Sequence, residues 1–216
     1  MGKPAALARL AIDVFASILA PPRCAACDAQ VGRLAAFCPP CASTVDAAGA
    51  DPEGALAAFV YGGAMARAIV RLKYEARPDL ARPLGDLLYR ALEPHAPSLR
   101  EAVVVPVPLH PSRLAQRGFN QSGLLARRLA RNLGAPFAPL VLARGRDTPK
   151  QASLDRGARL ANVAGAFRAR QPKRVEGRAV LLVDDVRTTG ATLAACSSAL
   201  VEAGARSVVT AVLAMA

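Results

Sequence analysis

The chain of 216 residues carries 28 Lys and Arg residues against 16 Asp and Glu residues, which gives a net charge of +12 at pH 7. Its length suits one α/β domain with a small appendage, and no apolar run reaches the roughly 20 residues that a membrane-spanning helix needs. Membrane insertion is therefore not expected. The basic charge favours phosphate ligands or nucleic acid as partners, and a basic surface kept only for solubility is the alternative.

Residues 5–19 are predicted to form an amphipathic helix. Apolar residues from Leu7 to Ile18 follow helical spacing, and two prolines follow the segment. A signal peptide is the competing interpretation, but Asp13 inside the apolar segment argues against it. We expect this helix to pack on the domain or to mediate self-association into a homo-oligomer.

Four of the five cysteines lie in the segment "CAACDAQVGRLAAFCPPC", as two CxxC pairs. Two such pairs can enclose one tetrahedral Zn²⁺, which then has no open coordination position and is structural. A redox pair or disulfides are the alternatives, but redox CxxC motifs usually lie near a βαβ unit. Clustered thiols suit a reducing compartment, so a cytoplasmic protein is expected. The predicted zinc ligands are Cys24, Cys27, Cys38 and Cys41.

A polar link near "DAAGADPEG" divides the chain into an N-terminal helix and zinc ribbon (1–46) and a larger domain (55–216). In the larger domain, apolar strands alternate with helices, which predicts an α/β fold with a mainly parallel twisted sheet and helices on both faces. Ligands of such sheets bind in the loops after the carboxyl ends of the strands. Strands are predicted at 57–63, 102–108, 139–144, 179–185 and 207–216, and helices at 64–75, 79–92, 120–134 and 190–204.

The stretch "VLLVDDVRTTGAT" (180–192) ends a buried strand with two neighbouring carboxylates, Asp184 and Asp185. Because such carboxylates repel each other and lose hydration, they need partners such as vicinal sugar hydroxyls or Mg²⁺. The turn that follows leads into a helix, where backbone N–H groups can bind a phosphate, although an ordinary helix cap is the alternative. Together they predict a ribose 5-phosphate site, whose phosphate cradle is Thr188, Thr189, Gly190, Ala191 and Thr192.

This stretch resembles the phosphoribosyl-pyrophosphate (PRPP) binding motif of type I phosphoribosyltransferases. The resemblance implies that the two aspartates, as catalytic residues, hold the ribose hydroxyls. It also implies that the turn over 188–192 holds the 5-phosphate and that PRPP is bound with Mg²⁺.

Two basic loops can hold the pyrophosphate of PRPP, because cations stabilise the charge that develops as it leaves. The loop after the strand at 102–108 offers Arg113 and Arg117. A second loop, which suits a flap that excludes water, offers Arg144, Gln151 and Arg156. Solvated basic surface is the alternative for both loops.

The segments "PVPLHPSRLAQRGFNQ" and "RDTPKQASLDRGARLANVAGAF", followed by the PRPP motif, resemble the competence protein F (ComF) family. A preceding zinc-ribbon segment matches the order of that family, so the resemblance covers nearly the whole chain. It implies a phosphoribosyltransferase-like domain linked to DNA uptake in natural competence, with single-stranded DNA and other competence proteins as partners. The family pattern is often a double ribbon, whereas this chain offers one complete set of four cysteines.

Three functions remain open on the sequence alone. The first is an enzyme, a glycosyltransferase that moves phosphoribose from PRPP to an amine or base, as in nucleotide or base salvage, and releases pyrophosphate. The second is a module that handles single-stranded DNA, although Tyr74 and Phe119 are the only tempting base-stacking residues. The third is a regulator that senses PRPP without turnover. No residue pattern identifies the acceptor of an enzyme.

Overall fold

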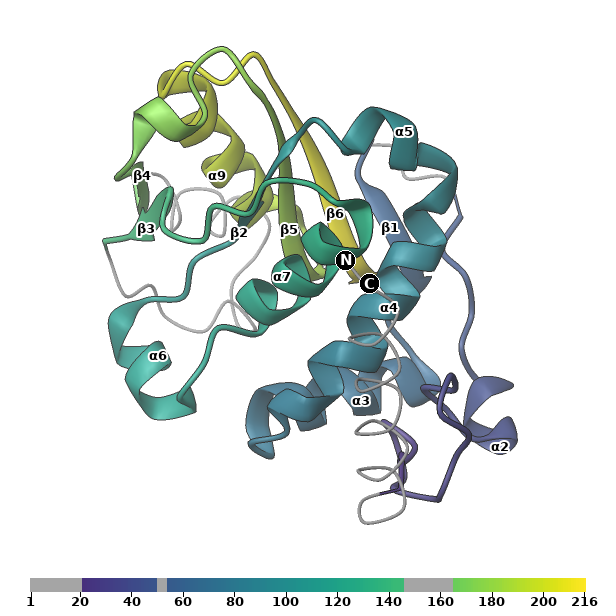
Figure 1. Cartoon of the computed structure of the whole chain (residues 1–216). Coiled ribbons are helices and arrows are strands. Elements are labelled where there is room, and N and C mark those ends of the chain that lie inside the picture. Colours follow the sequence, from purple (N-terminus) through teal and green to yellow (C-terminus); the bar gives the residue numbers. More distant parts are fainter. Residues whose placement is uncertain (1–20, 50–53, 146–164) are drawn as a thin grey trace, which may run out of the picture.

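The computed structural model describes residues 21–49, 54–145 and 165–216, and its centre is a four-stranded parallel sheet (Figure 1). The strand order is β1-β6-β5-β2. This arrangement confirms the predicted α/β class with a parallel sheet. The strands are β1 (Leu56–Val60), β2 (Val103–Pro106), β5 (Ala179–Arg187) and β6 (Ser207–Met215).

Helices cover both faces of this sheet because alternate residues of its strands are apolar on opposite sides. Leu181 of β5 belongs to one buried cluster, which includes apolar residues of α3 (Gly63–Tyr74), α4 (Ala81–Leu92) and α7 (Gln121–Leu133). Its neighbour Leu182 belongs to a second cluster with α9 (Ala191–Glu202). The two clusters confirm the prediction of helices on both faces.

Several short elements join these helices and strands. They contribute few residues to the core. Three of them, at residues 39–42, 111–117 and 172–174, carry or adjoin residues considered below. They are α2 (Pro39–Ala42), η1 (Pro78–Leu80), η2 (Glu93–His95), α5 (Ala96–Leu99), α6 (Pro111–Arg117) and η4 (Pro172–Arg174).

The strand predicted at 139–144 is shorter and does not join the main sheet. Strand β3 (Leu142–Arg144) instead pairs antiparallel with β4 (Phe167–Ala169) in a sheet of two strands. Only a single bridge, between Phe137 and Val104, connects the preceding segment to β2. Prolines at 136 and 139 flank that bridge and have no N–H to donate, which limits the pairing with β2.

The loop predicted after β2 contains the short helix α6. Its first residue is Pro111, and Nδ1 of His110 accepts a hydrogen bond from the backbone N–H of Ser112 at 3.3 Å. Gly118 ends the helix in the left-handed conformation, with a φ of 82°. A cap, an initial proline and a final glycine together start and stop one helical segment.

Strand β5 continues two residues beyond its predicted end at Asp185. Strand β6 runs beside it throughout, so that Val186 pairs with Ala214 and Arg187 with Met215. Strand β2, in contrast, stops at Pro106, opposite Val183. The two aspartates therefore lie within β5, at the edge where it extends past the carboxyl end of β2.

The cysteine-rich segment packs against the larger unit. Ala25 and Phe37 are buried in the same apolar cluster as Met65 of α3 and Leu84 of α4. The predicted helix at 5–19 lies outside the described residues, and the proposed division between 1–46 and 55–216 stays a prediction. Within the described ranges, no helix combines the length and apolar character needed to cross a membrane.

Candidate functional site

Each of the two aspartates of β5 is buried and has its own partner. Asp184 is 9% exposed and Asp185 is 3% exposed. The hydroxyl of Ser122, in the first turn of α7, donates to Oδ1 of Asp184 at 2.7 Å, and the backbone N–H of Asp185 donates to the same oxygen at 2.9 Å. Nζ of Lys73, near the end of α3, lies 2.9 Å from Oδ2 of Asp185 and forms an ion pair with it.

Burial and charge set the protonation of this acid pair. Burial, together with the neighbouring charge of Asp185, raises the pKa of Asp184 to about 7, against the opposing effects of Ser122 and Lys73. Burial lowers the pKa of Lys73, but the charge and hydrogen bond of Asp185, together with the charges of Asp184 and Tyr74, outweigh burial and the net change in pKa is upward. Near neutral pH the site therefore holds a Lys73–Asp185 ion pair beside a carboxyl group that can give up a proton.

The turn after β5 forms a small hollow at the start of α9. Gly190 precedes the helix in the left-handed conformation, with a φ of 73°, and the first turn of α9 contains no acidic residue. A hollow of about 20 Å³ is bordered by Asp184 and by the turn residues from Thr188 to Thr192. The predicted cradle therefore lies directly beside the acid pair, at the positive end of a helix dipole.

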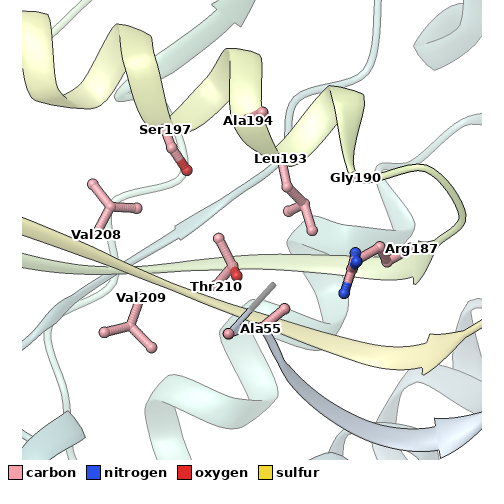
Figure 2. Close-up of a pocket in the computed structure, with 10 residues that line it drawn as sticks. Ala55, Arg187, Gly190, Leu193, Ala194, Ser197, Val208, Val209 and Thr210 are labelled. Atoms are coloured by element: carbon pink, nitrogen blue, oxygen red, sulfur yellow. The ribbon is translucent and has the colours of Figure 1, made fainter. Parts of the chain in front are cut away.

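A larger groove lies on the other side of this turn (Figure 2). It has a volume of about 320 Å³ and combines the guanidinium of Arg187 with the hydroxyls of Ser197 and Thr210 and an apolar wall. The wall is formed by Ala55, Leu193, Ala194, Val208 and Val209. Arg187, Gly190 and Leu193 border both this groove and the small hollow.

Arg117 contacts residues next to Lys73 and Ser122, the two side chains that bind the acid pair. Its guanidinium lies over the ring of Tyr74, 5.1 Å from the centroid, and donates to Oε1 of Gln121 at 2.7 Å. Tyr74 follows Lys73 on α3, and Gln121 precedes Ser122 on α7. The fold thus brings a predicted pyrophosphate-binding arginine close to the ends of α3 and α7.

The other predicted pyrophosphate residues lie on other elements or outside the described residues. Arg113 is half-buried on α6, and Arg144 of β3 lies over the ring of Phe167, 5.4 Å from its centroid. Gln151 and Arg156 fall outside the described residues. The roles of all four stay predictions.

Sequence reasoning missed Lys73 and the role of Ser122 at this site. Lys73 lies four residues after the fully buried Ile69, so helical spacing places it on the same buried side of α3. A cation at such a position needs an acidic partner, and this signal was available in the sequence. No sequence pattern assigns Ser122 to this site, whereas its hydroxyl binds Asp184.

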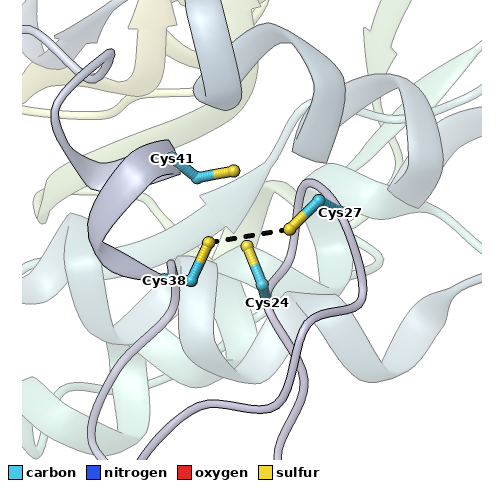
Figure 3. Close-up of side chains that lie close together, drawn as sticks. All are labelled: Cys24, Cys27, Cys38 and Cys41. Carbon is cyan, nitrogen blue, oxygen red and sulfur yellow. Dashed lines mark hydrogen bonds between the residues drawn. The ribbon is translucent and has the colours of Figure 1, made fainter.

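The four clustered cysteines bring their sulfur atoms to a common centre (Figure 3). All four Sγ atoms lie within 4.8 Å of one another, and those of Cys27 and Cys38 are 3.6 Å apart. Tetrahedral zinc with Zn–S bonds of about 2.3 Å requires sulfur separations near 3.8 Å. None of the described cysteines forms a disulfide. The donor set and its spacing therefore fit a structural zinc ion.

Local contacts perturb the thiols of this cysteine cluster and fix it on α3. Although burial raises the pKa of Cys24, hydrogen bonds from nearby backbone N–H groups lower it to about 6, whereas burial and the neighbouring thiols raise the pKa of Cys41 to about 12. Arg71 of α3 donates to the carbonyl oxygens of Cys24 and Ala25 at 3.4 and 3.2 Å and pairs with Asp28. The knuckle, defined as residues 23–45, is thus anchored on α3.

Comparison with known proteins agrees with this geometry. The sequence profile of the phosphoribosyl transferase domain matches residues 120–216, which include the acid pair and the turn. The DNA utilization protein YhgH of Escherichia coli (strain K12) is 36% identical over 152 residues, which are 68% of this chain and 66% of that protein. Competence protein F of Haemophilus influenzae is 37% identical over 141 residues, 63% of this chain and 61% of that protein.

The chain therefore spans just under two thirds of the length of these relatives. Among solved structures, a B. subtilis glutamine PRPP amidotransferase aligns with a TM-score of 0.44 and 24% identity, over 67% of this chain and 30% of that chain. With its matching profile, its relatives and its N-terminal four-cysteine cluster, the chain belongs to the ComF/YhgH family of proteins with a phosphoribosyltransferase domain.

Proposed function

We propose that this protein binds PRPP with Mg²⁺ at the acid pair of β5 and the turn over 188–192. One observation carries the proposal: two buried carboxylates in β5 directly precede a turn that begins a helix, inside the part of the chain that matches a phosphoribosyltransferase domain. Carboxylates accept hydrogen bonds from a ribose diol, and the N–H groups of the turn can receive a phosphate.

The proposed reaction is the transfer of phosphoribose to a nitrogen acceptor. The acceptor nitrogen bonds to C1 of the ribose while the bond from C1 to the pyrophosphate oxygen breaks and pyrophosphate leaves. Asp184 and Asp185 hold the ribose, and Arg117 faces the departing anion together with Arg113, Arg144, Gln151 and Arg156. Bound Mg²⁺ supplies positive charge that offsets the charge on the leaving group.

Calorimetric titration with PRPP and Mg²⁺ tests the binding step. Wild-type protein is expected to bind, and a protein whose acid pair is replaced by asparagines is not. Release of pyrophosphate then separates an enzyme from a sensor that binds PRPP without turnover. We place this activity in the cytoplasm, where a reducing environment keeps the knuckle thiols free to bind zinc.

We also propose a second function, binding of single-stranded DNA, because exposed cations gather at the opposite end of the sheet. The backbone N–H of Arg206 bonds to the carbonyl of Arg178 at 2.9 Å, so the segments that precede β5 and β6 lie side by side (Figure 1). Five exposed cations lie in these segments, and none of them forms an ion pair with a described acidic residue. They form the basic face: Arg170, Lys173, Arg174, Arg178 and Arg206.

Phosphate contacts of this kind are independent of base sequence and sensitive to salt. The name of the E. coli relative, a DNA utilization protein, also supports the proposal of DNA binding. Arg174→Glu with Arg178→Glu should weaken retention of a single strand and lower its salt dependence by roughly two contacts. The matched control is Arg82→Glu with Arg127→Glu, two exposed arginines on α4 and α7, which pack in the other apolar cluster. Equal losses in both variants would contradict a DNA site on the basic face.

A further inference from the structure

Helix α3 carries two largely buried cations near its carboxyl end. Arg71 is 8% exposed as a residue, and the side chain of Lys73 is 18% exposed. A buried cation destabilises a protein unless a counter-charge and hydrogen bonds compensate for its lost hydration. Both cations are compensated, but by different parts of the molecule.

Arg71 binds the knuckle. Its guanidinium reaches the carbonyl oxygens of two knuckle residues and the carboxylate of Asp28, and its Nε donates to Glu75 one turn further along α3 at 3.0 Å. Arg77, just beyond the helix, pairs with the other oxygen of Asp28 at 3.0 Å. These contacts fix the end of α3 on the knuckle.

Lys73 binds the acid pair. The only cation that forms an ion pair with Asp184 or Asp185, within the described ranges, is this lysine, 2.9 Å from Oδ2 of Asp185. Asp184 is held separately by the hydroxyl of Ser122. Without Lys73, the buried carboxylate of Asp185 would lose its ion-pair partner, and nothing would hold its orientation from the side of α3.

We propose that Lys73 is a positioning residue of the PRPP site: it holds Asp185 charged and oriented toward the ribose diol, and the anchored α3 holds Lys73 in place. This inference rests on the proposed PRPP binding. It assigns to Lys73 a role that acts through Asp185 on the ribose, and not through direct contact with the pyrophosphate.

Two ligands separate these roles, because PRPP and ribose 5-phosphate share the ribose and the 5-phosphate while only PRPP carries pyrophosphate. Calorimetric titration is carried out with each ligand, in the presence of Mg²⁺, on wild-type protein, Lys73→Met and Lys73→Arg. Lys73→Met should bind each ligand roughly 30-fold more weakly or worse, as expected when one partner of a buried ion pair is removed. The factor should be similar for PRPP and for ribose 5-phosphate. Lys73→Arg, which keeps the charge, should recover part of that affinity for both.

The matched control is Arg90→Met, which removes an exposed cation of α4 that belongs to neither the acid pair nor the basic face, and it should bind both ligands like wild type. Zinc content and circular dichroism verify that Lys73→Met is folded. In addition, Lys73→Met should lower the free energy of unfolding clearly less in an Asp185→Asn background than in wild type, because the partner charge is already absent.

Wild-type affinity in a folded Lys73→Met variant would overturn this inference alone. A loss confined to PRPP would also overturn it, because Lys73 would then contact the pyrophosphate. Failure of the wild-type protein to bind either ligand would instead contradict the proposed function, and with it the role given to Lys73.

Discussion

At the scale of single residues, the two aspartates are adjacent in sequence but differ in environment. Lys73 compensates the charge of Asp185, whereas Asp184 accepts hydrogen bonds from a neutral hydroxyl and a backbone N–H. Burial therefore acts most strongly on Asp184 and raises its pKa to about 7. A ribose diol needs acceptors, so this carboxyl must be ionised for the site to accept both hydroxyls.

This difference predicts how the stability of the ligand-free protein depends on pH. An unfolded aspartate has a pKa of about 3.9, so between that pH and the folded value of about 7 the folded protein binds the extra proton. The stabilisation from Asp184 is thus complete below pH 4 or so and is lost as the pH rises toward 7. From pH 5 to 7 the free energy of unfolding of wild type should fall, by up to about 1.4 kcal/mol per pH unit from this group.

Guanidinium denaturation of wild type and Asp184→Asn over this pH range measures the effect. All other titrating groups are common to both proteins, so the difference between their curves isolates Asp184. The difference should change between pH 5 and 7 and level off above pH 8. Parallel curves across the whole range would show that Asp184 titrates in the folded protein as it does in the unfolded chain.

At the scale of secondary-structure elements, α3 connects the knuckle with the edge of the sheet. Arg71 and Lys73 are two residues apart and bind these two regions. The carbonyl groups that Arg71 binds belong to Cys24 and Ala25, inside the first CxxC turn. Because few apolar residues stabilise the knuckle itself, its conformation should depend on the metal.

Removal of zinc is therefore expected to weaken PRPP binding even though the four cysteines are separate from the acid pair. After treatment with a zinc chelator and exchange into Mg²⁺ buffer, affinity should fall by roughly 10-fold, which corresponds to about 1.4 kcal/mol. A colorimetric assay records the released metal, about one equivalent per chain, and titration measures the affinity. Addition of zinc should restore it. Unchanged affinity in fully demetallated protein would mean that the knuckle does not support the site.

At the scale of the whole molecule, the sequence predicted the features that depend on long apolar patterns. The apolar segments 102–108 and 179–185 and the helices between them predicted the parallel sheet. The rule that ligands bind at the carboxyl ends of parallel strands predicted the edge where the acid pair lies. Features decided by local backbone chemistry were not predicted: the sequence predicted a loop where the capped helix α6 forms, and the prolines at 136 and 139 limit the pairing of the segment before β3 with β2.

Contacts between distant segments were the hardest to predict. Nothing near Asp185 in the sequence identifies Lys73 as its partner, because only the packing of α3 beside β5 and β6 brings them together. The four cysteines, in contrast, are close in sequence and share one type of chemistry, so their cluster was predicted completely. The two proposed sites lie at opposite ends of β5. The acid pair, proposed to bind PRPP, lies late in the strand, and the basic face, proposed to bind single-stranded DNA, lies before its start.

The central claim is that the acid pair and the turn after it hold PRPP, and calorimetric titration of PRPP with Mg²⁺ into matched variants tests it most directly. Wild type and Asp86→Asn, which removes a carboxylate of α4 that pairs with Arg128 away from the site, should bind alike. The Asp184→Asn/Asp185→Asn double variant should lose at least roughly 100-fold, because two acceptors of the ribose diol lose their charge. Equal binding by the double variant and wild type would contradict the account.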